Sequence, residues 1–264
     1  MNEILRYQAG QIPSRQPDEL AIEEPLEIRV KGKAVSVTMR TPGHDEELAA
    51  GFLLSEGIIT SWHDLVDIEP CKHDTLGNIV NVTLDSRLAV DFARLTRHVF
   101  ASSSCGLCGK ATIESILKTI DSIGADAGVD AAALLALPEK LRQAQPAFDR
   151  TGGSHAAALF TSAGELLVAR EDVGRHNAVD KAVGYALLNQ RLPLDRHILL
   201  VSGRASFEIM QKSLAARIPI VAAISAPSTL AVEFARESGQ TLVGFLRGQR
   251  MNVYNGAERI AFTS

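Results

Sequence analysis

The chain has 264 residues, a formal net charge of −4, 46% hydrophobic residues and 22% charged residues, a composition typical of a folded globular protein. The small negative charge excludes a general polyanion-binding surface, so duplex nucleic acid is not expected as a partner. No apolar run is long enough to cross a bilayer, and the N-terminal segment lacks the apolar core of a signal peptide. We therefore expect a cytoplasmic protein without a membrane partner.

The first ninety residues predict a small α+β part. Residues 25–30 (PLEIRV) and 34–40 (AVSVTMR) flank a Lys-Gly-Lys turn and predict a β-hairpin. Residues 44–57 predict a helix, because acidic residues fill the first turn, an apolar stripe follows and Gly57 is a suitable C-terminal stop. Residues 78–84 (NIVNVTL) predict another strand, and a short helix is expected near 91–98.

Residues 102–110 (SSSCGLCGK) contain two of the three cysteines of the chain. Cys105 and Cys108 lie two residues apart and are flanked by glycines. Apolar residues recur at helical spacing over 111–120, so an amphipathic helix is expected directly after this loop. Cys108 is therefore expected close to a helix N-terminus.

Residues 126–148 are Ala-rich and interrupted by Pro, and they predict one or two short connecting helices. They divide the chain into an N-terminal part over 1–125 and a C-terminal domain over 149–264. That domain begins with a predicted hairpin over 155–170. Later strands and helices alternate. The expected strands are 198–203, 219–225, 241–246 and 251–254, and the expected helices are 176–190, 207–217 and 229–239.

Apolar strands that alternate with helices predict an α/β fold with a mostly parallel sheet covered by helices on both faces. Ligands of such sheets bind beyond the carboxyl ends of the strands. Three polar loops are expected there, namely residues 202–206, 225–228 and 247–250. Ser206 and Ser228 are suitable N-caps for the helices that follow. Because Arg204, Arg247 and Arg250 also lie in these loops, the sequence predicts a crevice for an anionic ligand.

The Cys105–Cys108 pair allows several interpretations. Two small residues in a turn need no function, and a structural zinc site would need further ligands, such as Cys71 and His98 or His73. A thioredoxin-like dithiol is a third interpretation, although such a pair usually follows a strand near the start of a domain.

A reactive thiol is the fourth interpretation, and the local electrostatics favour it. A helix N-terminus and Lys110 both stabilise a thiolate, and the glycines let the loop present its sulfur to a partner. Such a thiolate can attack a sulfur donor and hold a persulfide, and the second thiol can release that sulfur by exchange. The CxxC motif alone does not separate redox chemistry from sulfur transfer.

A second polar constellation is Glu171-Asp172-Val-Gly-Arg175-His176-Asn177. It is either an ion-paired cluster at the start of a helix, with Asn177 as the N-cap, or a site in which His176 is a general acid or base or binds a ligand. Residues 151–155 (TGGSH) form a third polar loop, and His155 is interpreted as a strand-edge residue rather than a ligand.

Taken together, these motifs resemble those of the formate dehydrogenase accessory sulfurtransferase family (FdhD). The matching stretches are EEPLEIR, TPGHDEELAAGFLLSEGI, SSSCGLCGK, TGGSHAAAL, EDVGRHNAVDKAVG, SGRASFEIMQKSLAARIPIVAAISAPSTLAVEFA and TLVGFLRGQRMNVY. They span nearly the whole chain in the family's order. The extreme N-terminus and residues 126–148 match weakly, and Cys71 lies outside the family motifs.

The resemblance implies a function as well as a fold. Proteins of this family take persulfide sulfur from a cysteine desulfurase and deliver it to the bis-guanine-dinucleotide molybdenum cofactor that formate dehydrogenase requires. On this sequence the family implies Cys105 as the persulfide carrier and Cys108 as its partner, although proximity to the helix favours Cys108 as the more acidic thiol. The cofactor-binding residues implied by the resemblance are Phe245, Leu246, Arg247, Gly248, Gln249 and Arg250. No metal and no permanently bound cofactor are expected, because the molybdenum cofactor is a substrate, and a homodimer is implied.

The family's C-terminal domain is also similar to cytidine deaminases. Zinc deaminases need an H-x-E motif and a later P-C-x-x-C motif. This chain has His176-Asn177-Ala178 in the first place and residues 202–207 (SGRASF) in the second. We therefore exclude deaminase chemistry while expecting the deaminase-like fold. Two alternatives to sulfur transfer remain, a CxxC dithiol oxidoreductase and a non-enzymatic chaperone of the molybdenum cofactor.

Overall fold

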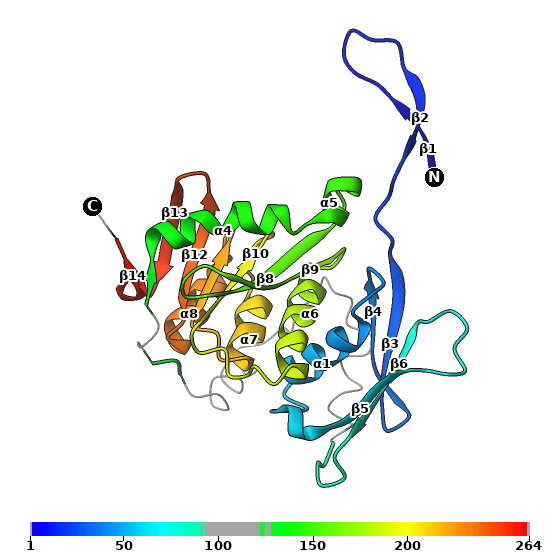
Figure 1. Ribbon diagram of the computed structural model, residues 1–264, viewed down its shortest axis with the longest axis vertical. Coiled ribbons are helices and arrows are strands. Elements are labelled where there is room, and N and C mark those ends of the chain that lie inside the picture. The colour runs from blue at the N-terminus through cyan, green and yellow to red at the C-terminus, as the bar shows by residue number, and fades with distance from the viewer. Residues whose placement is uncertain (1, 91, 93–121, 125–127, 263–264) are drawn as a thin grey trace.

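The structure is a computed structural model that describes residues 2–90, 92, 122–124 and 128–262 (Figure 1). Its N-terminal elements are β1 (Asn2–Arg6), β2 (Ser14–Asp18), β3 (Glu24–Val30), β4 (Lys33–Arg40), α1 (Asp45–Ser55), β5 (Leu65–Pro70) and β6 (Ile79–Leu84). Its later elements are β7 (Val129–Asp130), α4 (Ala131–Gln143), α5 (Pro146–Thr151), β8 (His155–Thr161), β9 (Leu166–Asp172), α6 (Arg175–Leu188), β10 (His197–Val201), α7 (Phe207–Ala215), β11 (Ile220–Ala223), α8 (Thr229–Ser238), β12 (Thr241–Arg247), β13 (Arg250–Asn255) and β14 (Ile260–Ala261). Single 3-10 turns occur at Trp62–Asp64 and Ala257–Arg259.

A six-stranded sheet with the order β13-β12-β11-β10-β8-β9 forms the centre of the C-terminal part. β10, β11 and β12 are parallel neighbours, whereas β8 pairs antiparallel with both β9 and β10. β9 therefore runs in the same direction as the three parallel strands, and only β8 and β13 run the opposite way. The predicted α/β class is confirmed, and the antiparallel pairs are the two hairpins that open and close the sheet.

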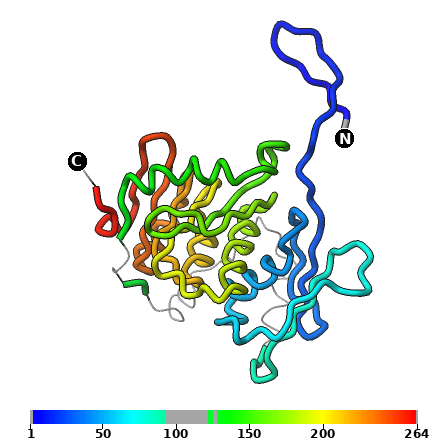
Figure 2. The backbone as a smooth tube through the Cα atoms, in the orientation of Figure 1, coloured from blue at the N-terminus to red at the C-terminus, as the bar shows by residue number. Residues whose placement is uncertain are grey.

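Helices cover both faces of this sheet, as Figures 1 and 2 show. On one face, Leu134, Leu137 and Leu141 of α4 are fully buried in a cluster with alternate residues of the strands, including Phe160 and Leu200. On the other face, α6, α7 and α8 share a larger core with the remaining strand residues. The alternation follows from the strand period of two residues, which sends successive side chains to opposite faces.

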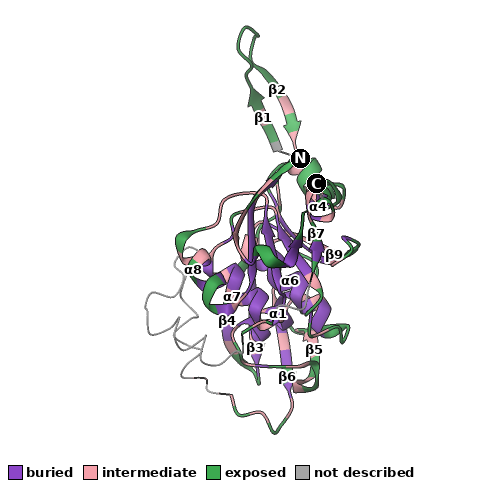
Figure 3. Cartoon of the chain, turned by 90° about the vertical axis from the view of Figure 1, so that its left-hand side faces the viewer, coloured by how far each residue is buried: buried purple, intermediate pink, exposed green. Residues whose placement is uncertain are grey.

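A second sheet with the order β4-β3-β6-β5 lies beyond α1, and α1 packs against α6. The predicted hairpin is confirmed as β3 and β4, with its turn at Lys31 and Gly32, both of which have positive φ. Leu26, Ile28 and Val30 point from β3 into the same core as α1 and α6. The N-terminal sheet therefore shares its core with the C-terminal part, and Figure 3 shows buried residues through both.

The N-terminal hairpin of β1 and β2 extends away from the rest of the molecule (Figure 1). Its strands pair only with one another among the described residues, and Leu5, Tyr7 and Ile12 are largely exposed. The sequence does not predict this hairpin, because its polar and apolar residues follow neither a helical nor a strand period.

Most other expected elements are confirmed within a few residues, including α1, β6, α6, α7 and α8. Residues 126–148 contain α4 and the start of α5, and α4 is a covering layer of the C-terminal sheet. The domain boundaries at 125 and 149 remain a prediction. The helices expected over 111–120 and near 91–98 fall outside the described residues, except for Phe92. No helix in the described part of the chain is long and apolar enough to cross a membrane.

Candidate functional site

Four strands of the large sheet, β9, β10, β11 and β12, end at the same edge. Backbone hydrogen bonds link the loop after β10 to the loop after β11, and the loop after β11 to the end of β12. Ser228 donates to the carbonyl of Ala205 at 2.9 Å, and Phe245 donates to the carbonyl of Ser225 at 3.0 Å. Ala205 and Pro227 also form an isolated parallel bridge. The three loops predicted from the sequence therefore lie side by side at the carboxyl edge of the sheet, where ligands of such folds bind.

Residues Phe245 to Arg250, which the sequence singles out for cofactor binding, form the tip of the β12–β13 hairpin. These residues differ in solvent exposure. Leu246 is fully buried in the core beneath α4, whereas residues 247–250 are exposed. Phe245 adopts a φ of 51°, a left-handed conformation that is strained for an aromatic residue. The guanidinium of Arg247 lies over its ring, 5.7 Å from the centroid.

Glycine at position 244 makes this arrangement possible. A Cβ atom on Gly244 would lie 2.8 Å from Pro227 and 3.0 Å from Tyr254, so no side chain fits between the second loop and β13. Arg247 and Arg250 are register partners across the hairpin. The hairpin tip therefore presents a half-buried aromatic ring beside two exposed cations, a combination that suits a base and its phosphates.

At the other end of the same edge, His176 of α6 meets Glu208 of α7. His176 Nε2 lies 2.7 Å from Glu208 Oε2 and 3.2 Å from Ser206 Oγ. The hydrogen bond from His176 lowers the pKa of Glu208 below its ordinary value, and the charges of Lys212 and Arg175 act in the same direction, against burial. Glu208 is therefore ionised at neutral pH and holds the imidazole in place.

Two further side chains pack around Gly203, in the loop after β10. A Cβ atom on Gly203 would lie 3.4 Å from His155 Nδ1 and 3.7 Å from Arg175 Cδ. Burial lowers the pKa of His155, and the charge of Arg175 adds to this effect, so this imidazole is neutral at pH 7. The Nε atom of Arg175 is buried and has no hydrogen-bond partner in the described part of the chain.

The prediction that Asn177 is the N-cap of its helix is wrong. The helix begins two residues earlier, at Arg175, and Gly174 occupies the N-cap position. No side-chain hydrogen bond caps the helix at Gly174, and Gly174 N itself donates to Asp172 Oδ1 at 2.8 Å. Asn177 instead donates to Asp172 Oδ1 and to the carbonyl of Met39, and so joins the helix to β4.

Ser206 and Ser228 were both expected as N-caps, and they differ in the structure. Ser228 caps α8, because its hydroxyl accepts a hydrogen bond from Ala231 N at 3.2 Å. Ser206 occupies the N-cap position of α7 without accepting a hydrogen bond from its backbone. Its hydroxyl contacts His176 instead, which adds a third group to the His176–Glu208 pair.

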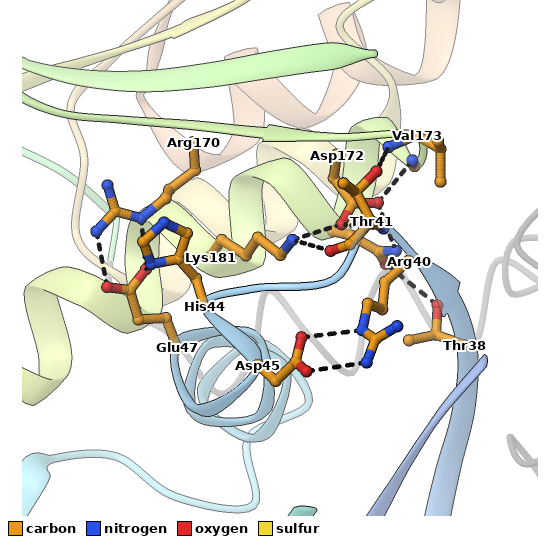
Figure 4. A network of polar contacts seen from close by, with 12 residues as sticks. Thr38, Arg40, Thr41, His44, Asp45, Glu47, Arg170, Asp172, Val173 and Lys181 are labelled. Carbon is orange, nitrogen blue, oxygen red and sulfur yellow. Dashed lines mark hydrogen bonds and ion pairs between the residues drawn. The ribbon is translucent and has the colours of Figure 1, made fainter. Parts of the chain in front are cut away.

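A buried network fixes the end of β9 beneath this site (Figure 4). Asp172 and Lys181 are 0% and 1% exposed and form an ion pair of 2.7 Å. Thr41, in the loop after β4, bonds to both: its backbone N donates to Asp172 Oδ2 at 3.1 Å, and its carbonyl accepts from Lys181 at 2.7 Å. A buried ion pair that also hydrogen-bonds to Thr41 links both parts of the molecule in one arrangement.

A second buried pair lies deeper between the helices. Lys212 of α7 bonds to both carboxylate oxygens of Asp180 at 2.8 Å, and Ser55 of α1 donates to Asp180 at 2.9 Å. Burial opposes the charge of Lys212, but the Asp180 carboxylate raises the pKa of this ammonium above its ordinary value, so Lys212 keeps its charge. Three helices are thus joined by polar contacts below the edge.

The predicted carrier Cys105 and its partner Cys108 lie outside the described residues. Cys71, a ligand in the zinc interpretation, is a partly buried free cysteine in the loop after β5. Within the described ranges, no group of three or more His, Cys, Asp or Glu side chains could hold a metal ion.

Sequence reasoning missed the role of Glu208. It places His176 correctly at the start of a helix but does not connect it with a carboxylate thirty-two residues away. Its position in the sequence could have indicated this contact, because Glu208 lies in the first turn of the helix that follows a predicted edge loop. Two helices that start at one sheet edge bring their first turns together.

Comparisons with known proteins show which family the chain resembles over nearly its whole length. The model of the FdhD/NarQ family matches residues 21–261. The chain is 53% identical over 266 residues to the sulfur carrier protein FdhD of Streptomyces coelicolor, covering 98% of this chain and 94% of the relative. It is 54% identical to the protein of that name from Mycolicibacterium paratuberculosis, covering 97% of each chain, and 46% identical to that of Saccharolobus solfataricus, covering 92% and 91%.

A crystal structure from Desulfotalea psychrophila, described as that of a formate dehydrogenase accessory protein, superimposes with a TM-score of 0.79. The two sequences are 27% identical, and the match covers 99% of this chain and 98% of the other. Sequence motifs, fold and relatives agree over almost the whole length, and the chain belongs to the FdhD/NarQ family.

Proposed function

We propose that this protein is a sulfur carrier in formate dehydrogenase maturation. It accepts persulfide sulfur from a cysteine desulfurase and delivers it to the molybdenum cofactor in its bis-guanine-dinucleotide form. The observation that carries the proposal is the identity of about half of all residues to sulfur carriers, over nearly the full length of both chains.

Cys105 is the proposed carrier. Its thiolate attacks the outer sulfur of the donor's persulfide, and the electron pair of the thiolate forms the new S–S bond. The donor cysteine leaves as a thiolate, so the outer sulfur moves without a change in the total electron count. Cys108 is the partner thiol, placed to protect or release the bound sulfur.

The proposed binding site for the nucleotide is the hairpin tip, from Phe245 to Arg250. Three features support it: the exposed cations of Arg247 and Arg250, the half-buried ring of Phe245 on a left-handed backbone, and the adjacent edge loops with the capped start of α8. Cations and helix N-termini suit phosphates, and an aromatic face suits a purine. The cofactor binds as a substrate and leaves after it has received sulfur.

Cytoplasmic location and a homodimer are part of the same proposal. A reducing compartment suits a protein with an odd number of cysteines and a reactive thiol. A two-fold assembly suits a ligand with two nucleotide arms.

Intact-protein and peptide mass spectrometry tests the carrier assignment. The protein is incubated with a cysteine desulfurase and free cysteine, and wild type is compared with Cys105→Ala and Cys108→Ala, with Cys71→Ala as the control. We expect one added sulfur atom in wild type and Cys71→Ala, and none in Cys105→Ala. Loss only in Cys108→Ala would reverse the two roles. A Cys105–Cys108 disulfide without added sulfur would favour a dithiol oxidoreductase, and formate dehydrogenase activity with Cys105→Ala would favour a chaperone.

A further inference from the structure

Arg175, the first residue of α6, is a partly buried cation that lacks a counter-charge. Its guanidinium forms no hydrogen bond and no ion pair with any residue that the structure describes, and its Nε atom is buried. A buried donor without a partner costs free energy, and such groups are rare in folded proteins. The unpartnered guanidinium therefore points to a bound ion or ligand.

Two acidic side chains near Arg175 are engaged with other cations or donors. Asp172, three residues earlier, is fully buried and forms its ion pair with Lys181 at 2.7 Å. The charge of Arg175 acts on Glu208, but the carboxylate of Glu208 contacts His176 at 2.7 Å. Neither carboxylate forms an ion pair with Arg175, so the positive charge of this arginine is left for another anion.

The position of Arg175 is also unfavourable for the helix that it begins. The first turn of α6 contains no acidic residue. Because the N-terminal end of a helix carries a partial positive charge, a cation in the first turn is repelled. Local features that cost stability without a compensating contact are typical of functional sites. An anion bound in front of Arg175 would compensate both the arginine and the helix end.

The surroundings of Arg175 belong to the carboxyl edge of the large sheet. A Cβ atom on Gly203, in the loop after β10, would lie 3.7 Å from Arg175 Cδ and 3.4 Å from His155 Nδ1. His155 begins β8, which pairs with both β9 and β10 and so lies between their ends. Arg175, Gly203 and His155 therefore meet where ligands of such sheets bind.

Arg204 supplies a second cation directly after Gly203. Its side chain is exposed and forms no ion pair within the described ranges. Burial lowers the pKa of His155, and the charge of Arg175 lowers it further, so the positive charge here comes from the two arginines. Gly203 has no side chain, which lets a ligand approach the backbone between these groups.

We propose that Arg175 binds a phosphate group at this edge, with Arg204 as a second cation. The planar guanidinium offers paired donors that match two phosphate oxygens. The loop after β11 separates this phosphate subsite from the hairpin tip, because Ser228 donates to Ala205 and Phe245 donates to Ser225. The phosphate belongs either to a nucleotide held at the tip or to a free phosphate, and only the first case rests on the proposed function.

Inorganic pyrophosphate is the probe, since it carries the phosphate oxygens of a nucleotide without the base. Its dissociation constant is measured by isothermal titration calorimetry at low salt for wild type, Arg175→Gln, Arg175→Lys and Arg204→Gln. The matched control is Arg236→Gln, because Arg236 is an exposed arginine in the last turn of α8, at the opposite edge of the sheet.

Arg175→Gln is expected to weaken pyrophosphate binding about 10- to 100-fold, because a charge-assisted pair of hydrogen bonds is lost. Arg175→Lys should recover part of this affinity, since it keeps the charge but not the planar fork. The exposed Arg204 should contribute less, about two- to fivefold. Arg236→Gln and the tip variant Arg247→Ala/Arg250→Ala should bind pyrophosphate as the wild type does.

Guanosine diphosphate then distinguishes the two sources of the phosphate. If the phosphate belongs to a nucleotide held at the tip, saturating guanosine diphosphate displaces pyrophosphate, and Arg175→Gln weakens the binding of both. If it is a free phosphate, pyrophosphate binds equally well in the presence of the nucleotide, and Arg175→Gln leaves the nucleotide affinity unchanged. Both results support the phosphate subsite at Arg175.

Three results would overturn the proposal: no pyrophosphate binding by wild type, wild-type affinity in Arg175→Gln, or equal weakening in Arg236→Gln. If circular dichroism shows that Arg175→Gln is misfolded, Arg175→Lys and Arg204→Gln decide, and unchanged affinity in both rejects the subsite. Sulfur loading by a cysteine desulfurase, followed by intact mass, is measured separately. Wild-type protein that binds pyrophosphate but takes up no sulfur would overturn the proposed function and leave the phosphate subsite in place.

Discussion

Gly184 of α6 lies so close to Glu47 of α1 that a Cβ atom on the glycine would be 1.8 Å from the Glu47 carbonyl oxygen. Gly51 of α1 has the same relationship with Asp180 of α6, at 1.9 Å. The two helices therefore cross backbone against backbone, and this contact joins the N-terminal sheet to the C-terminal part.

Gly184→Ala is accordingly expected to destabilise the protein by about 1–3 kcal/mol or more, because the added methyl group meets backbone atoms that cannot rotate away. Urea unfolding measures the change. Gly128→Ala is the control, since a Cβ atom there would meet nothing within 4 Å among the described residues and its φ is not positive. Equal destabilisation by the two substitutions would contradict the close crossing.

Lys181→Met should be strongly destabilising, by about 3–5 kcal/mol, because it leaves the fully buried carboxylate of Asp172 without its cation. The double variant Asp172→Asn/Lys181→Met should lose less stability than the sum of the two single variants. Chemical denaturation of all four proteins gives the coupling energy. Arg15→Met, which breaks an exposed ion pair with Glu3, is the control and should change stability by less than 1 kcal/mol. Additive effects in the cycle would show that the buried pair is not coupled.

Local patterns in the sequence explain why the edge loops could be predicted. A strand such as β10 or β11 is a short apolar run followed by a polar loop and a helix. Each of these patterns is local, because it can be recognised within a window of about a dozen residues. Parallel strands then bring their carboxyl ends together whatever the details of the side chains. The positions of Arg247 and Arg250 at that edge follow from the strand order alone.

Contacts between elements distant in the sequence could not be predicted in this way. Asn177 has the residue type of an N-cap, but it lies inside the first turn of α6, where its amide donates to Asp172 and to the carbonyl of Met39. Glu208 approaches His176 only once α6 and α7 are packed on one face of the sheet. Side-chain partners of this kind depend on the assembled fold, which residue types alone do not specify.

Acid is expected to destabilise the protein through His155. Burial and Arg175 lower the pKa of this imidazole below its ordinary value of about 6.5, while His176 lowers it further and Asp172 opposes them. Below that pH the unfolded chain binds the proton more readily than the folded protein, so stability falls as the pH falls below about 6.5.

Urea unfolding between pH 7.5 and 5 checks this expectation. His155→Gln should lose less stability on acidification than the wild type does, whereas His73→Gln, at an exposed position, should behave as the wild type. The pKa of Glu208 is lowered in the folded protein. Its contribution to stability is therefore present above the ordinary glutamate pKa of about 4.5 and is lost only in more acidic solution. An unchanged slope in His155→Gln would mean that this imidazole is protonated in the folded protein.

Guanosine diphosphate is expected to bind at the hairpin tip through Arg247 and Arg250. Both side chains are exposed and face one another across the turn, so their removal should cost affinity without loss of stability. Each change to Ala should weaken binding about tenfold, equivalent to about 1.4 kcal/mol, and the double variant should lose more. Isothermal titration calorimetry measures the dissociation constants, and the weakening should diminish at high salt, which screens exposed charges. Arg87→Ala, in the exposed turn after β6, is the control. Wild-type affinity in the double variant would place the nucleotide elsewhere on the molecule.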